Sequence, residues 1–255
     1  MKRETMDKAV LKRERLNKYL ASCGICSRRD ADRLIEEKRV LVNGKAAAMG
    51  MQVSSQDKIQ VNGKEVTGPD DKVVLAYYKP LGVVCTERDR FADKKITDAV
   101  KYPIRVTYAG RLDKDSEGLL LLTNDGDLIE AMMRGGKGHE KEYIVKVNKE
   151  LTEDFLNKMA AGVYLPELAV TTKPCQIEAI GKFTYRIILT QGVNRQIRRM
   201  SGELGYQVFS IKRVRVVNIQ LAKLKPGEYR KLSQEELRVL YNECRMAAAE
   251  NQINR

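Results

Sequence analysis

The stretch Gly-Pro-Asp-Asp at residues 68–71 divides the sequence into two parts with different hydrophobic patterns. Glycine and proline next to aspartate interrupt helices and strands, so this stretch predicts a boundary between two domains. We place a small domain at residues 13–70 and a larger one at residues 73–245, and we expect flexible tails at residues 1–12 and 246–255. With 255 residues, the chain is long enough for each part to have a core of its own.

The first part has the pattern of two helices followed by hairpins. Apolar residues recur with helical spacing at residues 14–21, and Gly24 ends that segment. Ser27 and Asp30 form the start of a capping box, which predicts a second helix. Asn-Gly pairs at residues 43–44 and 62–63 predict tight hairpin turns, because both residue types tolerate positive φ.

The second part mixes strands and helices without regular alternation. We expect strands at residues 73–79, 105–109, 118–123, 142–147, 185–190 and 208–221, and helices at residues 127–134, 152–161, 194–204 and 234–246. Residues 88–95 form a charged loop, and the glycine-rich residues 135–138 form a flexible connector. This order favours an α+β domain with a mixed or antiparallel sheet over a doubly wound fold.

The charge of the chain favours a polyanionic partner. The chain has 47 Lys and Arg against 34 Asp and Glu, a formal net charge of +13. A basic excess of this kind is typical of proteins that bind nucleic acid. No apolar run approaches the ~20 residues of a membrane span, the N-terminus has no apolar region of a secretory signal, and five cysteines without framework spacing fit a reducing cytoplasm. We therefore expect a cytoplasmic protein without a membrane partner.

Two patterns suggest metal sites, and the sequence argues against both. Cys23 and Cys26 form a C-x-x-C pair, but the one histidine is His139, so the roughly four ligands of a zinc site are not at hand. The acidic residues within residues 113–118 match the start of a calcium loop, but the position of its closing glutamate is Asn124 and a strand follows. We expect no metal site.

Two clusters of arginines could bind phosphates. Arg28 and Arg29 lie in the first turn of the second helix, where the helix N-terminus and the forked guanidiniums both suit phosphate oxygens. Arg195 is three and four residues before Arg198 and Arg199, so the three share a helix face. For both clusters the alternative is a solvated basic surface.

A charged loop lies between two apolar strands at residues 110–118, with the sequence Gly-Arg-Leu-Asp-Lys-Asp-Ser-Glu-Gly. Loops fixed by rigid strands are where catalytic groups tend to lie. The residues alone leave open which of Asp113, Asp115 and Glu117 would be catalytic.

Several motifs resemble known families. Residues 15–66 resemble an S4 RNA-binding domain, through Arg-Leu-Asn-Lys-Tyr-Leu, Ser-Arg-Arg-Asp-Ala and Val-Asn-Gly. Residues 110–123 resemble the catalytic motif of the RsuA-type pseudouridine synthases, whose branches include RsuA, RluB, RluE and RluF. Further motifs of that family resemble Tyr-Lys-Pro-Leu-Gly at 78–82, Lys-Glu-Tyr at 141–143 and Arg-Gln-Ile-Arg-Arg-Met at 195–200. Residues 139–143 and 194–196 look most like the RluF branch, which acts on large-subunit (23S) ribosomal RNA.

The resemblance implies roles for individual residues. Among the three acidic residues of the loop it selects Asp113 as the catalytic carboxylate, acting as nucleophile or as base. We therefore expect Asp115→Asn and Glu117→Gln to keep substantial activity. The resemblance implies that Tyr143 lies against the target base, and that Arg198 pairs with Asp113 and favours its ionised form. It also implies that Arg111 takes the place of the flipped nucleotide or contacts its phosphates.

The resemblance also implies the reaction and the partners. A uridine would leave the helical stack and be isomerised to pseudouridine, without metal or organic cofactor. Structured RNA would contact Arg28, Arg29, Arg111, Arg195 and Arg199. We expect ribosomal RNA of the large subunit as substrate, with transfer RNA as a further possibility, and a monomeric enzyme.

Two alternatives stay open at this point. A non-catalytic S4-type protein that binds RNA or the ribosome would explain the charge and residues 15–66, but would leave Asp113 and Tyr143 without a role. An S4-linked methyltransferase should have a glycine-rich turn between a strand and a helix, and the sequence has none.

Overall fold

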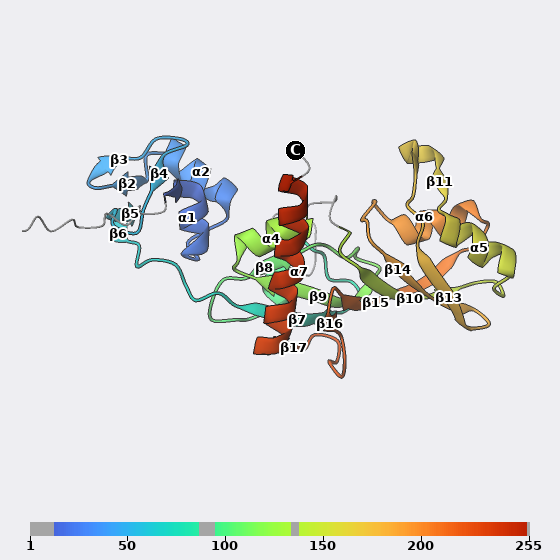
Figure 1. The fold of residues 1–255 in the computed structure, drawn as a ribbon. Helices are drawn as coiled ribbons and strands as arrows, with labels where there is room; N and C mark the ends of the chain where they lie inside the picture. Colours follow the sequence, from blue (N-terminus) through green and yellow to red (C-terminus); the bar gives the residue numbers. More distant parts are fainter. Residues whose placement is uncertain (1–12, 87–94, 134–137, 254–255) are drawn as a thin grey trace, which may run out of the picture. The chain divides into compact units, whose positions relative to one another are not determined.

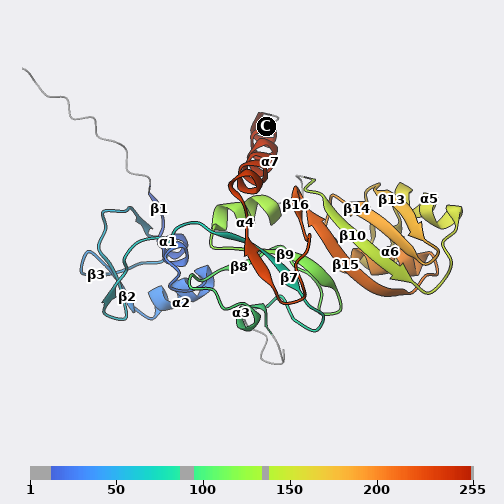
Figure 2. The same cartoon turned by 90° about the horizontal axis from the view of Figure 1, so that it is seen from below.

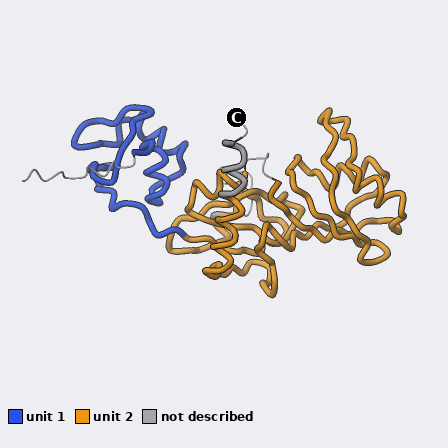
Figure 3. Tube along the Cα trace, in the orientation of Figure 1, with its two compact units in different colours: residues 1–72 blue, residues 73–255 orange. Residues whose placement is uncertain are grey.

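The computed structural model describes the backbone of residues 13–86, 95–133 and 138–253. The chain forms two compact units, Met1–Lys72 and Val73–Arg255 (Figure 3). The expected tail at residues 1–12, most of the charged loop at 88–95 and most of the glycine-rich connector at 135–138 lie outside the described residues.

The first unit packs two helices against short strands. The helices are α1 (Leu16–Ser22) and α2 (Arg28–Glu36). A small sheet has the order β3 (Lys45–Ala46), β2 (Val40–Val42), β5 (Ile59–Val61) and β6 (Lys64–Glu65), and β1 (Glu14–Arg15) pairs with β4 (Gln52–Val53). The apolar sides of both helices and of the strands share one buried cluster, which includes Leu20, Ile35, Val40 and Ile59.

The local predictions for this unit are confirmed. The Ser27 side chain caps α2, because its Oγ accepts a hydrogen bond of 3.2 Å from the backbone N–H of Asp30. The two Asn-Gly turns have positive φ at both positions, 52° and 78° in each turn. They close the hairpins β2–β3 and β5–β6, and β2 pairs with β5 to join them.

The second unit is built on one mixed sheet of nine strands (Figure 2). The order along the sheet is β13 (Gln176–Gly181), β14 (Thr184–Leu189), β10 (Lys141–Val147), β15 (Val208–Val216), β9 (Glu117–Thr123), β7 (Val74–Lys79) and β17 (Tyr229–Lys231), while β16 (Ile219–Gln220) pairs with β15 and β8 (Thr107–Ala109) with β9. Among these pairs, β15 and β9 are parallel and the others antiparallel. The expected α+β class with a mixed sheet is confirmed.

Helices cover the two ends of this sheet separately (Figure 1). At one end, α4 (Gly126–Met133) and α7 (Gln234–Ile253) pack on a buried cluster with Leu119, Leu121 and Leu240. At the other end, α5 (Glu153–Ala161) and α6 (Gln196–Glu203) pack on a second cluster. A short helix, α3 (Ile96–Ala99), belongs to a third cluster on the β7–β9 side. The two halves therefore meet where β15 and β9 lie side by side.

The structure differs from the sequence-based expectation at several places. The strands β13 and β17 were not expected, and neither was the hairpin of β11 (Tyr164–Leu165) and β12 (Val170–Thr171), which flanks the short 3-10 helix Pro166–Leu168. The edge strand β13 is mostly exposed, so its sequence lacks the apolar alternation of a half-buried strand. The backbone of α7 continues to Ile253, whereas we expected the helix to end at residue 246 and a flexible tail to follow.

Candidate active site

The charged loop at residues 110–118, which we call the anchored loop, connects β8 to β9. Buried cations hold its backbone. Arg213 of β15 is 3% exposed, and its guanidinium donates hydrogen bonds to the carbonyl oxygens of Leu119 (2.7 Å) and Arg111 (3.3 Å), just beyond and near the start of the loop. Lys79 at the end of β7 is fully buried, and its Nζ donates to the carbonyl oxygens of Ser116 (2.7 Å) and Pro80 (3.0 Å).

Two further donors complete the support of the anchored loop. The Nη2 of Arg198 donates to the carbonyl oxygen of Asp115 at 2.8 Å. The backbone N–H of Gly82 donates to the carbonyl oxygen of Lys114 at 2.9 Å. The loop is therefore fixed through its main chain, and its acidic side chains are left partly open to solvent: Asp113 is 39% exposed and Asp115 is 47% exposed.

The structure corrects the expected partner of Arg198. Its Nε lies 3.2 Å from Oδ2 of Asp115, and its Nη1 donates to the carbonyl oxygen of Val208 at 3.0 Å. The Nε–H is not aligned with the carboxylate for a hydrogen bond, so this contact is ionic. The expected pair of Arg198 with Asp113 is wrong, because Arg198 is held between two main-chain oxygens that place it at Asp115.

Asp115 instead has two arginine partners. Arg195 binds its carboxylate with both terminal nitrogens, at 3.2 and 2.8 Å. The hydrogen bond from Arg195, together with the charges of Arg198 and Arg195, lowers the pKa of Asp115 against the opposing effect of partial burial. The stabilisation of a carboxylate that we expected at Asp113 therefore acts on Asp115. In the described parts of the chain, the ion pair of Asp113 is with Arg195, at 3.9 Å.

Tyr143 lies close to the anchored loop. It is half-buried on β10, next to an irregularity of the β10–β15 ladder between Glu142 and Tyr143. Its ring packs against the apolar cluster that contains Leu112, the residue before Asp113. The structure thus brings the second motif close to the first.

Lys141 lies two residues before Tyr143, and therefore on the same face of β10. Its Nζ donates to the carbonyl oxygen of His139 at 3.0 Å. Burial, and then the charge of Arg213, lower the pKa of Lys141 to about 8. Lys141 therefore loses its proton at a lower pH than an exposed lysine does.

The other predicted RNA contacts are spread over the chain. Arg28 and Arg29 are exposed on α2, and among the described residues neither has a carboxylate partner. Arg111 is exposed beside Asp113. Arg199 turns away from the loop, since its guanidinium pairs with Glu167 and donates to the carbonyl oxygen of Asn194.

The sequence did not single out the two anchoring cations. Lys79 stood in a family motif without a role. Arg213 had one usable signal, because it shares a strand face with Ile211 and so occupies a position where alternation calls for an apolar residue.

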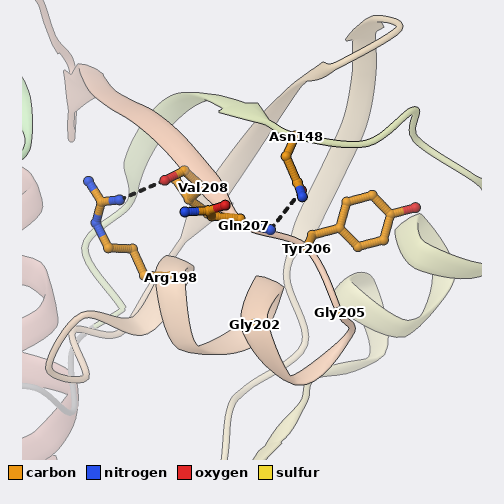
Figure 4. A pocket seen from close by; sticks show the side chains of 7 residues that line it. All are labelled: Asn148, Arg198, Gly202, Gly205, Tyr206, Gln207 and Val208. Carbon is orange, nitrogen blue, oxygen red and sulfur yellow. Dashed lines mark hydrogen bonds between the residues drawn. The ribbon is translucent and has the colours of Figure 1, made fainter.

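A hollow of about 510 Å³ is formed mainly by residues of α6 and of the segment that leads into β15 (Figure 4). It is lined by Asn148, Arg198, Gly202, Gly205, Tyr206, Gln207 and Val208. In Figure 4, Arg198 donates to Val208 on one side and the Gln207 backbone donates to Asn148 on the other. Arg198 is the residue that the hollow shares with the loop contacts, whereas Asp113 and Tyr143 do not line it.

Within the described ranges, no three histidine, cysteine or acidic side chains are grouped so that they could bind a metal ion. Cys23 packs against the core of the first unit, and burial raises the pKa of its thiol to about 11. The helices of the described residues are too short or too polar to cross a membrane.

Comparison with known families agrees with the fold and the motifs. Residues 14–59 match the S4 domain, and residues 73–202 match the family described as RNA pseudouridylate synthase. The chain belongs to this RNA pseudouridylate synthase family and carries an S4 domain before the synthase domain. It is therefore an RNA-modifying enzyme, not a non-catalytic S4-type binding protein.

Comparison with individual relatives indicates the branch of the family to which the chain is most similar. The chain is 48% identical to the dual-specificity RNA pseudouridine synthase RluF of Salmonella typhi over 88% of this chain and 77% of the relative. It is 35% identical to the ribosomal large subunit pseudouridine synthase B of Bacillus subtilis, over 89% and 95%. A crystal structure of a pseudouridylate synthase superposes with a TM-score of 0.66 at 29% identity, covering 89% of this chain and 99% of the other. The expected resemblance to the RluF branch is confirmed.

Proposed function

We propose that this enzyme converts uridines of large-subunit ribosomal RNA to pseudouridine, with transfer RNA as a second substrate class, and that Asp113 is its catalytic carboxylate. The relatives named for dual specificity and for the ribosomal large subunit support this substrate class. The observation that carries the catalytic assignment is the anchored loop, which is fixed through its main chain and presents a half-exposed Asp113 beside Arg195.

The reaction breaks the N-glycosidic bond of the uridine, turns the base, and forms a bond from the sugar to a carbon of the same base. Because a helical stack hides that bond, the nucleotide must first leave the stack, which costs a few kcal/mol. The carboxylate of Asp113 then acts toward the sugar as nucleophile or as base. Its 39% exposure leaves it accessible to a flipped nucleotide, and Arg195 at 3.9 Å offsets part of its charge.

Tyr143 supplies an aromatic face for the flipped base and a hydroxyl for proton transfer. Its packing against the Leu112 cluster supports this role, since it fixes the ring near the loop. Arg111, exposed beside Asp113, would fill the space that the nucleotide leaves or contact its phosphates.

The remaining arginines would bind the RNA backbone. Arg28 and Arg29 lie exposed at the N-terminus of α2, where the helix dipole also favours phosphate. Arg199 is paired with Glu167, so its contact with RNA would require that pair to open. Asp113, Tyr143 and the arginines come from one chain, and on this ground we infer that a monomer is active.

The test of Asp113 is a single-turnover assay at equal RNA occupancy. Asp113→Asn keeps the shape of the side chain but removes its charge, so we expect a folded protein that binds RNA and forms no pseudouridine. Glu117→Gln is the matched control: Glu117 ends the same loop and accepts a hydrogen bond from the Tyr78 hydroxyl at 2.9 Å, which an amide oxygen can also accept. Normal product from Asp113→Asn would refute the assignment.

The substrate class is tested separately. Pseudouridines would be mapped in ribosomal and transfer RNA of a strain that lacks the gene, and again after the gene is restored. We expect a site in large-subunit ribosomal RNA to lose its pseudouridine in the deletion strain and to regain it with the wild-type gene only. An unchanged map in that RNA would contradict the proposed substrate.

A further inference from the structure

Asp115 is the point where the anchored loop and α6 are joined by charge. Its carboxylate accepts both hydrogen bonds from the end of Arg195 and lies 3.2 Å from Nε of Arg198. Its carbonyl oxygen accepts a further bond from Nη2 of Arg198. Four contacts thus tie this one residue to two arginines that are three positions apart on the chain.

The conformation of Arg195 shows that its position is specified. Its φ is 50°, in the left-handed region that residues other than glycine rarely adopt, and it precedes the first turn of α6. A backbone of this kind persists only where surrounding contacts determine it. The two hydrogen bonds from its side chain to Asp115 are such contacts.

Arg195 in turn is the cationic neighbour of Asp113. The distance from its Nη1 to Oδ2 of Asp113 is 3.9 Å. Asp115 therefore reaches the catalytic carboxylate through one intermediate side chain, Arg195. The two acidic residues lie two positions apart on the same fixed loop, so the geometry of this relay is set by the loop backbone.

We propose, on the basis of the function proposed above, that Asp115 is a positioning residue of this enzyme: its carboxylate holds Arg195 and Arg198 in place, and so fixes the cation beside Asp113 when the target nucleotide arrives. This revises our expectation that Asp115 is replaceable, which rested on the family motif requiring one carboxylate, Asp113. In this proposal Asp115 does not contact the sugar or the base, and it acts through Arg195 and Arg198.

The charges around Asp113 predict that RNA binding and the rate of the chemical step respond differently when Asp115 is replaced. Within the group formed by Asp113, Asp115, Arg195 and Arg198, two positive charges face two negative charges. Asp115→Asn leaves one positive charge in excess and frees Arg195 from its two-point contact. A freed guanidinium beside an RNA site should bind a phosphate, so RNA binding should stay the same or become tighter. The chemical step should nevertheless slow, because Asp113 loses a fixed neighbour.

The experiment measures both quantities for Asp115→Asn, with Asp115→Glu as the conservative variant and Glu117→Gln as the control on the same loop. We expect the single-turnover rate of Asp115→Asn at saturating RNA to fall about tenfold or more, within the range that small misplacements of reacting groups cost. Its Kd for RNA should not rise, and if the freed arginine binds a phosphate the log–log salt slope should steepen by roughly 0.7–0.9. Asp115→Glu should recover part of the rate, and Glu117→Gln should keep the wild-type rate.

A double variant tests the path through Arg195. If Asp115 acts through Arg195, then Asp115→Asn combined with Arg195→Gln should be no slower than the slower single variant, because the two changes break one unit. Independent losses that multiply would contradict the relay.

Other outcomes would overturn the proposal. The first is a rate for Asp115→Asn within about twofold of wild type, which is well below the expected cost of misplacement. The second is a slower rate together with weaker RNA binding and a lower Tm, which indicates a structural role of Asp115. If Asp115→Asn does not fold, a rate for Asp115→Glu equal to wild type with weakened RNA binding would also overturn it. The proposed function fails differently: the wild-type chain would then form no pseudouridine, or Asp113→Asn would be active.

Discussion

Gly118 and Arg213 lie directly opposite each other where the parallel strands β9 and β15 join the two halves of the sheet. Gly118 has φ of 111°, and a Cβ at this position would lie 2.3 Å from the carbonyl oxygen of Arg213. The guanidinium of the same Arg213 also holds the anchored loop. The close approach of two backbones therefore fixes the strand that follows Asp113.

We predict that Gly118→Ala destabilises the protein by at least the roughly 1–3 kcal/mol typical of an overpacked site. The added methyl group would push β9 from β15, and the positive φ adds strain. Gly227→Ala is the control, since Gly227 also has positive φ (89°) but nothing lies within 4 Å of its added Cβ. Urea unfolding of both variants measures the difference; equal losses of stability would mean that the close approach is not the cause.

We predict that Tyr143→Phe binds RNA nearly as wild type does while its single-turnover rate falls sharply, because in the proposed function the hydroxyl serves in proton transfer. Tyr143→Leu should in addition weaken the hold on the flipped base, since it loses the aromatic face. Full activity of both variants, measured as pseudouridine formed per enzyme-bound RNA, would remove Tyr143 from the site.

We predict that Arg28→Ala with Arg29→Ala weakens RNA binding and flattens its salt dependence. Each lost phosphate contact should reduce the log–log slope by roughly 0.7–0.9. Arg33→Ala on the same helix is the control, because Arg33 is already paired with Asp30 at 3.0 Å. A loss of affinity in the double variant with an unchanged slope would show that these arginines do not contact phosphates.

We predict a pH-dependent effect of Lys141 on stability. Its pKa falls to about 8 in the folded chain, below its usual value of 10.5, so the folded state disfavours the charged amine. This penalty is complete below pH 8 and is relieved as the pH rises from about 8 to 10.5, because the unfolded chain then binds more protons. Lys141→Met should therefore be more stable than wild type at pH 7, with a difference that shrinks toward pH 10.

Urea unfolding at several pH values measures this effect. Lys146→Met, which removes an exposed lysine of the same strand, controls for the general loss of a lysine. A constant difference between wild type and Lys141→Met across this pH range would contradict the lowered pKa.

Local signals in the sequence were sufficient for much of the fold. Ser27 predicted the start of α2, and the Asn-Gly pairs predicted two hairpins, because capping and positive φ depend on neighbouring residues alone. The edge strand β13 gave no such signal. Its pairing with β14 is what makes it a strand, and its exposed side chains do not reveal that partner.

The structure brings several of the predicted site residues close together, but the sequence did not predict how they pair. The motif identified Asp113, yet the choice of Arg198 between Asp113 and Asp115 depends on where the Asp115 and Val208 carbonyl oxygens lie. Those positions follow from contacts between residues more than 80 positions apart in sequence, such as Arg198 with Asp115. The roles of Lys79 and Arg213 were missed for the same reason, since each binds a carbonyl oxygen that every residue possesses.

Anchoring of this kind leaves the displayed side chains free to change. Lys79 and Arg213 bind main-chain oxygen atoms, which remain when the side chain of a loop residue is replaced. The loop should therefore keep its shape with an amide, a thiol or an imidazole in place of the Asp113 carboxylate. Natural drift or laboratory selection can thus explore new reactivity at position 113 without first rebuilding a scaffold. The loop backbone is in this sense a stable support, and a different side chain on it could catalyse other reactions of a flipped nucleotide.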